Sequence, residues 1–161
     1  MKIACVSDTH VSRGMGKLPQ GLYEALKGVD MVLHAGDIVS LDVIEELKAI
    51  APTEAVAGNM DGWDVAKVLP EKKVIQAGRF RIGLTHGGGR LPGMEERILE
   101  RFADDDVDVI VYGHSHKPNI ERRGKVLMVN PGSPTDKTYA PYNSYAVLTL
   151  DDEVAAEIIR L

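Results

Sequence analysis

Cysteine is almost absent from this sequence, because Cys5 is the only one among 161 residues. A single cysteine forms neither an internal disulfide nor a cluster of thiolate metal ligands. Any metal ion bound by this chain is therefore expected to be held by histidine, aspartate, glutamate or asparagine.

Long apolar runs are missing as well. No run approaches the roughly 20 apolar residues that span a bilayer. The apolar start MKIACVSD reaches Asp8 too early to be a signal peptide. We therefore expect a cytoplasmic protein with no membrane partner.

An excess of positive charge is the third absence. The chain has 19 Lys and Arg against 24 Asp and Glu, so its net charge is −5 at pH 7. Such a charge does not attract a polyanion, which disfavours nonspecific binding of nucleic acid. With 44% hydrophobic and 27% charged residues, the composition is that of a compact globular protein. We predict a single domain over residues 1–161, large enough to bury roughly two-thirds of the surface of its unfolded chain.

The first 60 residues alternate between two kinds of pattern. Short apolar runs rich in β-branched residues predict strands, and apolar residues at helical spacing predict helices. This alternation is typical of a parallel α/β arrangement. The predicted elements are a strand at 2–7, a helix at 20–28, a strand at 30–35, a helix at 41–50 and a strand at 51–59.

The pattern changes after Trp63. Residues 72–87 predict two strands around a tight turn at Gly78, which indicates a hairpin. A helix at 94–103 and a strand at 106–113 return to alternation, and hairpins are predicted at 119–133 and 144–159. The fold class is α/β, and two mixed sheets packed face to face with helices outside would accommodate these elements.

Residues that bind metals follow each of the most apolar predicted strands. Since ligand sites in open α/β sheets assemble at the carboxyl ends of strands, we expect these side chains to meet. Four of the five histidines are in this set, so chance placement is a poor explanation. Its members are Asp8, His10, Asp37, Asn59, Asp61, His86, His114 and His116.

The spacing within the set gives a local reason for convergence. In SDTH and GHSH, two polar residues are separated by one residue, so on an extended segment both point to the same side. A glycine directly precedes Asp37 and Asn59, which permits tight turning and a close backbone approach. We therefore interpret His114 and His116 as metal ligands.

The residue types indicate which metals suit the site. Imidazole nitrogens with carboxylate or amide oxygens suit Mn²⁺, Fe²⁺, Zn²⁺, Ni²⁺ or Co²⁺, and we favour Mn²⁺. Without Asp61, seven residues remain, which is too many for one ion. Two divalent ions roughly 3.5–4 Å apart, bridged by one carboxylate, would use them. Two divalent ions carry four positive charges, and Asp8 and Asp37 neutralise only two of them. A hydroxide and a phosphodiester monoanion would balance the other two, so the centre suits a phosphodiester substrate.

Simpler roles explain some polar residues better. His34 lies inside an apolar strand before the turn, so we interpret it as a core residue or as a residue supporting the ligands. Asp61 and Asp64 are interpreted as caps of a following turn.

The ordered set resembles the calcineurin-like metallophosphoesterase superfamily, whose motifs run D-x-H, GD, GN, H and GHxH. They stand here as SDTH (7–10), AGD (35–37), AGNMD (57–61), THG (85–87) and GHSH (113–116). The later NPGS (130–133) resembles the small single-domain prokaryotic phosphodiesterase branch. The resemblance implies a four-layer α/β/β/α sandwich and a hydrolase that cleaves small phosphodiesters.

Site roles follow from the same resemblance, position by position. It implies Asp8, His10 and His116 on the first metal, and Asn59, His86 and His114 on the second. Asp37 is implied as the bridge, and a hydroxide held between the two ions would attack phosphorus. Catalytic roles are assigned to Asp37, Asn59 and His86.

One position departs from the larger members of the superfamily. They have a histidine after the asparagine, implicated at the leaving group, and this chain has Met60 there. A thioether donates no proton. The hypothesis is that activated esters are cleaved readily and unactivated ones slowly, unless water or Asp61 assists.

Two other functions stay open. A subunit of the retromer coat resembles this fold, has lost activity and serves as a protein-binding scaffold; here no ligand of the motif set is missing. A dinuclear amide hydrolase uses similar ligands. The sequence also leaves open the physiological substrate and whether the chain forms a homo-oligomer.

Overall fold

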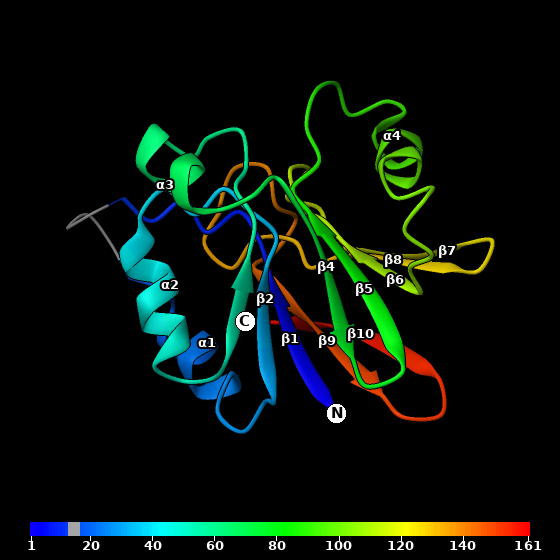
Figure 1. Cartoon of the computed structure of the whole chain (residues 1–161). Coiled ribbons are helices and arrows are strands. Elements are labelled where there is room, and N and C mark those ends of the chain that lie inside the picture. The colour runs from blue at the N-terminus through cyan, green and yellow to red at the C-terminus, as the bar shows by residue number, and fades with distance from the viewer. Residues whose placement is uncertain (13–16) are drawn as a thin grey trace.

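Two five-stranded sheets and four helices make up the described part of the chain (Figure 1). The computed structural model describes residues 1–12 and 17–161. Each sheet contains parallel and antiparallel strand pairs, so both sheets are mixed. Within these residues, no helix combines the length and apolar character needed to cross a bilayer.

The first sheet has the strand order β10-β9-β1-β2-β3. Its parallel part, β1 to β3, comes from the first 60 residues, which confirms the predicted parallel start of the chain. A hairpin of β9 and β10 extends the sheet on the other side of β1. The strands are β1 (Lys2–Val6), β2 (Met31–His34), β3 (Thr53–Ala55), β9 (Ser144–Leu150) and β10 (Val154–Arg160).

Helices α1 (Gln20–Ala25) and α2 (Leu41–Lys48) connect these parallel strands. Ser40 caps α2, because its side-chain oxygen accepts a hydrogen bond from the Asp42 backbone N–H at 3.3 Å. Both helices bury an apolar face against the outer side of the first sheet.

The second sheet has the order β4-β5-β6-β8-β7. The β4-β5 and β7-β8 pairs are antiparallel, which confirms the hairpins predicted at 72–87 and 119–133. Helix α4 (Met94–Arg101) provides the crossover from β5 to β6, and β6 is parallel to both of its neighbours. The strands are β4 (Lys72–Ala77), β5 (Phe80–Thr85), β6 (Val109–Val111), β7 (Asn119–Arg123) and β8 (Val126–Asn130).

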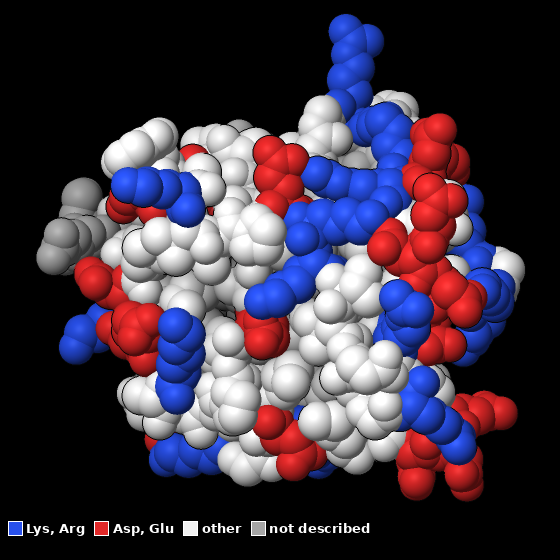
Figure 2. Space-filling view, viewed as in Figure 1, with Lys and Arg blue, Asp and Glu red and all other residues white. Residues whose placement is uncertain are grey.

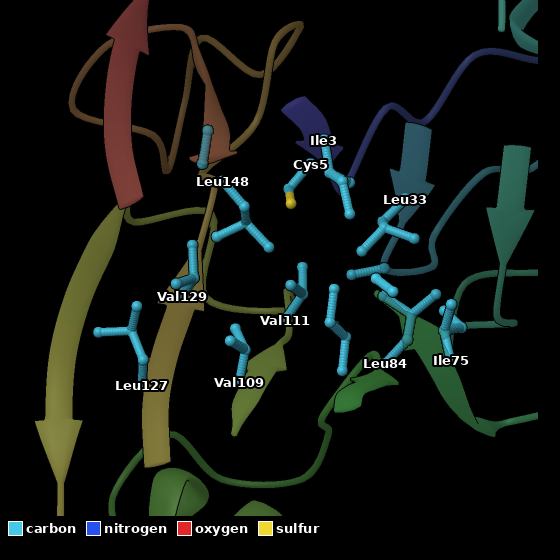
Figure 3. Close-up of a cluster of buried hydrophobic side chains, with 14 of the residues drawn as sticks. Ile3, Cys5, Leu33, Ile75, Leu84, Val109, Val111, Leu127, Val129 and Leu148 are labelled. Carbon is cyan, nitrogen blue, oxygen red and sulfur yellow. The ribbon is translucent and has the colours of Figure 1, made fainter. Parts of the chain in front are cut away.

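Three clusters of buried apolar side chains hold the layers together. Figure 3 shows the cluster between the sheets, where Leu33 and Leu148 of the first sheet pack with Leu84 and Val111 of the second. A second cluster lies between the first sheet and α1 and α2, and a third lies between the second sheet and α4. Burial of each such side chain contributes about 1.5–3 kcal/mol. The arrangement is a four-layer α/β/β/α sandwich, which confirms the predicted fold class.

One helix, α3 (Trp63–Val68), was not predicted. Only Val65 among its six residues is buried, and Trp63 is 77% exposed, so no apolar periodicity marks it. It begins after Gly62 and has no side-chain cap, so the interpretation of Asp64 as a cap is wrong.

The carboxyl ends of β1, β2, β5 and β6 lie at one edge of the molecule, opposite the N-terminus in Figure 1. The Asp8 N–H donates to the Gly36 carbonyl at 3.0 Å, which joins the loops after β1 and β2. The Gly113 N–H donates to the His86 carbonyl at 3.0 Å, which joins the loops after β5 and β6. Finally, the His114 N–H donates to the Asp8 carboxylate at 3.1 Å. The loops of both sheets therefore meet at this edge.

Candidate metal centre

Backbone strain is concentrated at the predicted ligands. Seven non-glycine residues among those described have positive φ, and five of them are predicted ligands. The left-handed conformation costs roughly 1–2 kcal/mol per residue for an ordinary side chain. Strain of this kind clusters at functional sites, where the surrounding structure enforces it. The five ligands are Asp8 (φ 54°), His10 (φ 46°), Asp37 (φ 55°), His114 (φ 72°) and His116 (φ 58°).

The glycines of the motifs permit close approach, as predicted. A Cβ on Gly58 would lie 2.2 Å from Oδ1 of Asp37, and one on Gly113 would lie 1.9 Å from Oγ of Ser7. Real Cβ atoms essentially never come this close to another heavy atom. Any larger residue at these two positions would therefore displace a neighbour in the centre.

The first group of converging ligand atoms is Asp8, His10 and His116. Nε2 of His116 lies 3.3 Å from Oδ1 of Asp8 and 3.3 Å from Nε2 of His10. All three candidate ligand atoms lie within 4.8 Å of one another. These three residues are the set that the sequence resemblance implied for the first metal.

The second group is Asp8, Asp37 and His86, and all three are buried. Nε2 of His86 lies 3.3 Å from Oδ2 of Asp37 and 3.8 Å from Oδ1 of Asp8. Oδ2 of Asp37 is also 3.7 Å from Nε2 of His10. Each carboxylate therefore reaches both groups, and the assignment of Asp37 as the bridge stays a prediction.

His86 provides a test of whether a cation fits. Its Nδ1–H donates to the Ala35 carbonyl at 2.7 Å, which leaves Nε2 with a lone pair. Nε2 is buried and has no hydrogen-bond partner among the described residues, although it faces the carboxylates of Asp8 and Asp37. A lone pair facing two carboxylates needs a cation between them, so the donor set fits a divalent metal ion.

A proton on Nε2 of His86 would also place a positive charge next to the carboxylates of Asp8 and Asp37. Burial alone lowers the pKa of His86, but Asp37 and Asp8 outweigh burial and the pKa is raised. Burial alone raises the pKa of Asp37, but the neighbouring His86 and the Met60 N–H outweigh it and lower the pKa. The pair is therefore arranged to hold a positive charge.

Asn59 and His114 lie together beside the second group. Oδ1 of Asn59 is 2.8 Å from Nδ1 of His114, and the His114 ring meets the His86 ring edge-on at 5.5 Å. With Nε2–H donated to the Gly89 carbonyl at 3.0 Å, Nδ1 of His114 is an acceptor facing another acceptor. A cation bound between these two acceptors would remove their repulsion. A rotation of the Asn59 amide that exchanges its oxygen and nitrogen would do the same. All seven predicted ligands are thus gathered at one edge of the molecule, while their roles stay predictions.

Comparison with known proteins agrees with this geometry. The chain matches the calcineurin-like phosphoesterase superfamily domain over residues 1–153. The chain belongs to this superfamily. This membership confirms the resemblance seen in the motifs and shows a probable metallophosphoesterase with two candidate metal-binding groups.

Three similar proteins illustrate the family. The chain is 35% identical to a probable metallophosphoesterase of Methanothermobacter thermautotrophicus, over 99% of this chain and 92% of the relative. It is 32% identical to a phosphodiesterase of Methanocaldococcus jannaschii, over 82% of this chain and 83% of the relative. A crystal structure of Vps29 with zinc from Entamoeba histolytica superposes with a TM-score of 0.78 at 26% identity, covering 99% of both chains.

Asp136 is a residue of the candidate metal centre that the sequence analysis missed. Its Oδ2 lies 2.6 Å from Nδ1 of His116, so Nε2 of His116 is directed toward Asp8. A carboxylate behind a ligating histidine fixes the ring and its tautomer. The hydrogen bond to Asp8, followed by that to Asp136, raises the pKa of His116 to about 9. No local pattern marks Asp136, because its partner is 20 residues away along the chain.

Asp61 supports the loop of Asp37, and its interpretation as a turn cap is wrong. Its Oδ1 accepts from the N–H groups of Ile38 at 2.8 Å and Val39 at 2.6 Å. Its Oδ2 accepts from Gly58 at 2.7 Å and Asp37 at 3.1 Å. The loop needs this support because Val39, a β-branched residue, has a φ of 73°.

His34 is fully buried, as predicted for a core or supporting residue. The Gly36 N–H donates to its Nδ1 at 3.2 Å, so Nε2 carries the hydrogen and donates to Oγ1 of Thr9 at 3.1 Å. Burial lowers the pKa of His34 to about 3. His34 therefore joins the loops after β1 and β2 in its neutral form.

We predict that replacing Asp61 by alanine weakens metal binding by roughly 10- to 100-fold, because the loop that carries Asp37 loses its anchor. The free energy of unfolding should fall by about 1–3 kcal/mol, because buried N–H groups lose their acceptor. Titration calorimetry with Mn²⁺ and urea unfolding measure the two effects. Asp61→Asn, which keeps one oxygen, should lose less, and the control Asp64→Ala on α3 should change Mn²⁺ affinity little. Unchanged Mn²⁺ affinity in Asp61→Ala would contradict the anchoring role.

We also predict an acid-sensitive contribution from His34. Its folded pKa lies below the unfolded value of about 6.5, so its contribution to stability is complete above pH 6.5 and declines as the pH falls. Between pH 7.5 and 5, the stability of the metal-free wild type should fall by about 2 kcal/mol more than that of His34→Gln. Urea unfolding across this range measures both proteins. Parallel pH profiles would show that His34 is not buried in its neutral form.

Proposed function

We propose that the chain is a divalent-metal-dependent phosphodiesterase that hydrolyses small phosphodiesters. The observation that carries the proposal is the convergence of Asp8 and Asp37 with the imidazoles of His10, His86 and His116. This cluster opens into a cavity of about 660 Å³ that is also lined by Asn59 and His114. The phosphodiesterase of Methanocaldococcus jannaschii, at 32% identity, supports the choice of reaction.

The charge of the centre suits an anionic ester. Asp8 and Asp37 bring two negative charges, so two divalent ions would leave two positive charges for the substrate and nucleophile. When bound, such ions supply Lewis acidity toward the phosphoryl oxygens and activation of water at neutral pH. In Figure 2, Lys and Arg side chains form a band between α3 and α4, although the net charge of the chain is −5. Among the described residues that line the cavity, an anionic substrate would meet one ammonium group, that of Lys117.

The protein residues fix the directions of the ligating atoms. The Met60 N–H donates to Oδ1 of Asp37 at 2.7 Å, which leaves Oδ2 for the centre. The Ala35 carbonyl orients His86, and Asp136 orients His116. Such preorganisation lowers the cost of placing charge in the transition state. Mn²⁺ is the metal that we propose first, with Ni²⁺, Fe²⁺, Zn²⁺ and Co²⁺ as alternatives.

Met60 and Asp61 are both poorly suited to protonate the leaving group. Met60 is 61% exposed in the cavity and has no proton to donate. Asp61 does not fill this role, because backbone N–H groups occupy both of its oxygens. Neither residue is therefore proposed to protonate the leaving group, and we expect water to assist its departure.

We predict that hydrolysis requires both a metal ion and Asp37. Metal-free protein should not cleave bis(p-nitrophenyl) phosphate, and added Mn²⁺ should restore turnover. Asp37→Ala should lose at least about 100-fold in kcat/KM, since interactions that stabilise transition-state charge are worth 10²–10³. The matched control Asp104→Ala, on an exposed loop, should behave as wild type. A folded protein that binds two ions without turnover with any of the five metals would instead favour a protein-binding scaffold.

We predict a steep dependence of rate on the leaving group. Across a series of methyl aryl phosphates, log kcat should fall as the pKa of the phenol rises. Met60→His places an imidazole at this exposed position and should flatten the slope, because general acid catalysis contributes typically 10²–10⁴-fold. Equal slopes in the two proteins would refute the assignment of Met60 to the leaving-group side.

A further inference from the structure

The cavity over the centre has an apolar wall. Eight large hydrophobic side chains are exposed among the described residues, and three of them line this one cavity. They are Met60, Leu91, which is 46% exposed, and Tyr139, which is 71% exposed. Single exposed apolar residues need no explanation, but a cluster beside a polar centre indicates a binding surface.

Tyr139 is held in place despite its exposure. The Asp136 carboxylate accepts hydrogen bonds from the N–H groups of Thr138 at 2.8 Å, Tyr139 at 2.9 Å and Ala140 at 2.8 Å. The same carboxylate bonds His116, and the Tyr139 ring meets the His116 ring edge-on at 5.9 Å. The residue that orients His116 therefore also holds the Tyr139 backbone, and the Tyr139 ring lies against the ring of that predicted ligand.

Tyr139 borders more than one cavity. A second cavity of about 520 Å³ shares His10, His116 and Tyr139 with the first. With Tyr139 71% exposed, none of the described residues covers the ring where it borders these cavities, so that part of its surface is available to a ligand. Aromatic side chains bind flat rings by stacking, with little sequence or substituent preference.

A positive charge lies at the same cavity. Lys117 directly follows His116 and lines the cavity, and its ammonium makes no hydrogen bond or ion pair with the described residues. An unpaired ammonium beside an apolar wall suits a ligand that combines an anionic and an apolar part.

We propose that this cavity binds a flat aromatic ester group of the phosphodiester, the one that is retained after cleavage, stacked on Tyr139 and packed against Leu91. Lys117 pairs with a phosphoryl oxygen. This inference rests on the proposed function, because it places the phosphate at the candidate metal centre. It names the substrate class as aryl or nucleobase-bearing phosphodiesters, in preference to dialkyl ones.

Binding of two phosphonates to the Mn²⁺-loaded protein tests the aromatic site directly. Phenylphosphonate and methylphosphonate share the anionic head, and only the first carries a ring. Stacking is worth about 1–3 kcal/mol, so we expect calorimetry to show phenylphosphonate binding about tenfold more tightly or better. Tyr139→Ala should bring the ratio close to one, while Tyr139→Phe should preserve it.

Two further variants separate the ring from the charge. Lys117→Gln should weaken both phosphonates by a similar factor and leave their ratio unchanged. The control Trp63→Ala removes an aromatic side chain of similar exposure outside this cavity and should change neither affinity. An equal affinity for the two phosphonates, or a ratio that survives Tyr139→Ala, would overturn the inference.

Turnover separates this inference from the proposed function. Methyl and phenyl p-nitrophenyl phosphates have the same leaving group, and the phenyl ester should show the higher kcat/KM in wild type but not in Tyr139→Ala. Hydrolysis of both esters without ring selectivity in binding would overturn the aromatic site alone. Ring-selective binding without any hydrolysis would overturn the phosphodiesterase function and support the site.

Discussion

The centre depends on two carboxylates, Asp8 and Asp37, that are buried close together. A buried charge is costly unless it is paired or hydrogen-bonded. In the described part of the chain, no Lys or Arg forms an ion pair with either carboxylate; only imidazoles and backbone N–H groups approach them. This arrangement is unfavourable for a purely structural cluster and is suited to holding cations. The loops, the glycines and the supporting side chains all serve to keep the two carboxylates in this position.

The backbone strain of the centre is offset by interactions in parts of the fold that take no part in the chemistry. The left-handed residues persist because side chains from later segments hold their loops. Asp61 fixes the loop after β2, and Ser133 donates to the Asp8 carbonyl at 2.7 Å. Asn130 donates to the Gly113 carbonyl at 3.0 Å and so supports the GHSH loop. The three buried apolar clusters between the layers of the fold supply stability that offsets this strain.

Much of this molecule could be predicted from its sequence, for identifiable reasons. The parallel start, the hairpins and the sandwich follow from periodicity and turn residues, which are local signals. The seven residues predicted as ligands stand out in the sequence because each follows a strong strand and belongs to an ordered motif, and their ligand roles stay predictions. Asp136 and Asp61 could not be assigned, because their roles consist of contacts with loops distant in the sequence. The α3 helix was missed because a helix with one buried residue carries no periodic signal.

The hydrogen bonds at Asp8 have a consequence for how the protein is made. Its carboxylate meets the His114 N–H, 106 residues later, and its carbonyl meets Ser133, 125 residues later. Contacts of such sequence separation form late, because loop closure must be completed before they contribute. A chain still emerging from the ribosome therefore carries its first histidine and aspartates without a centre around them. The candidate metal centre therefore assembles only after the last third of the chain has joined the fold, so unfinished molecules lack it.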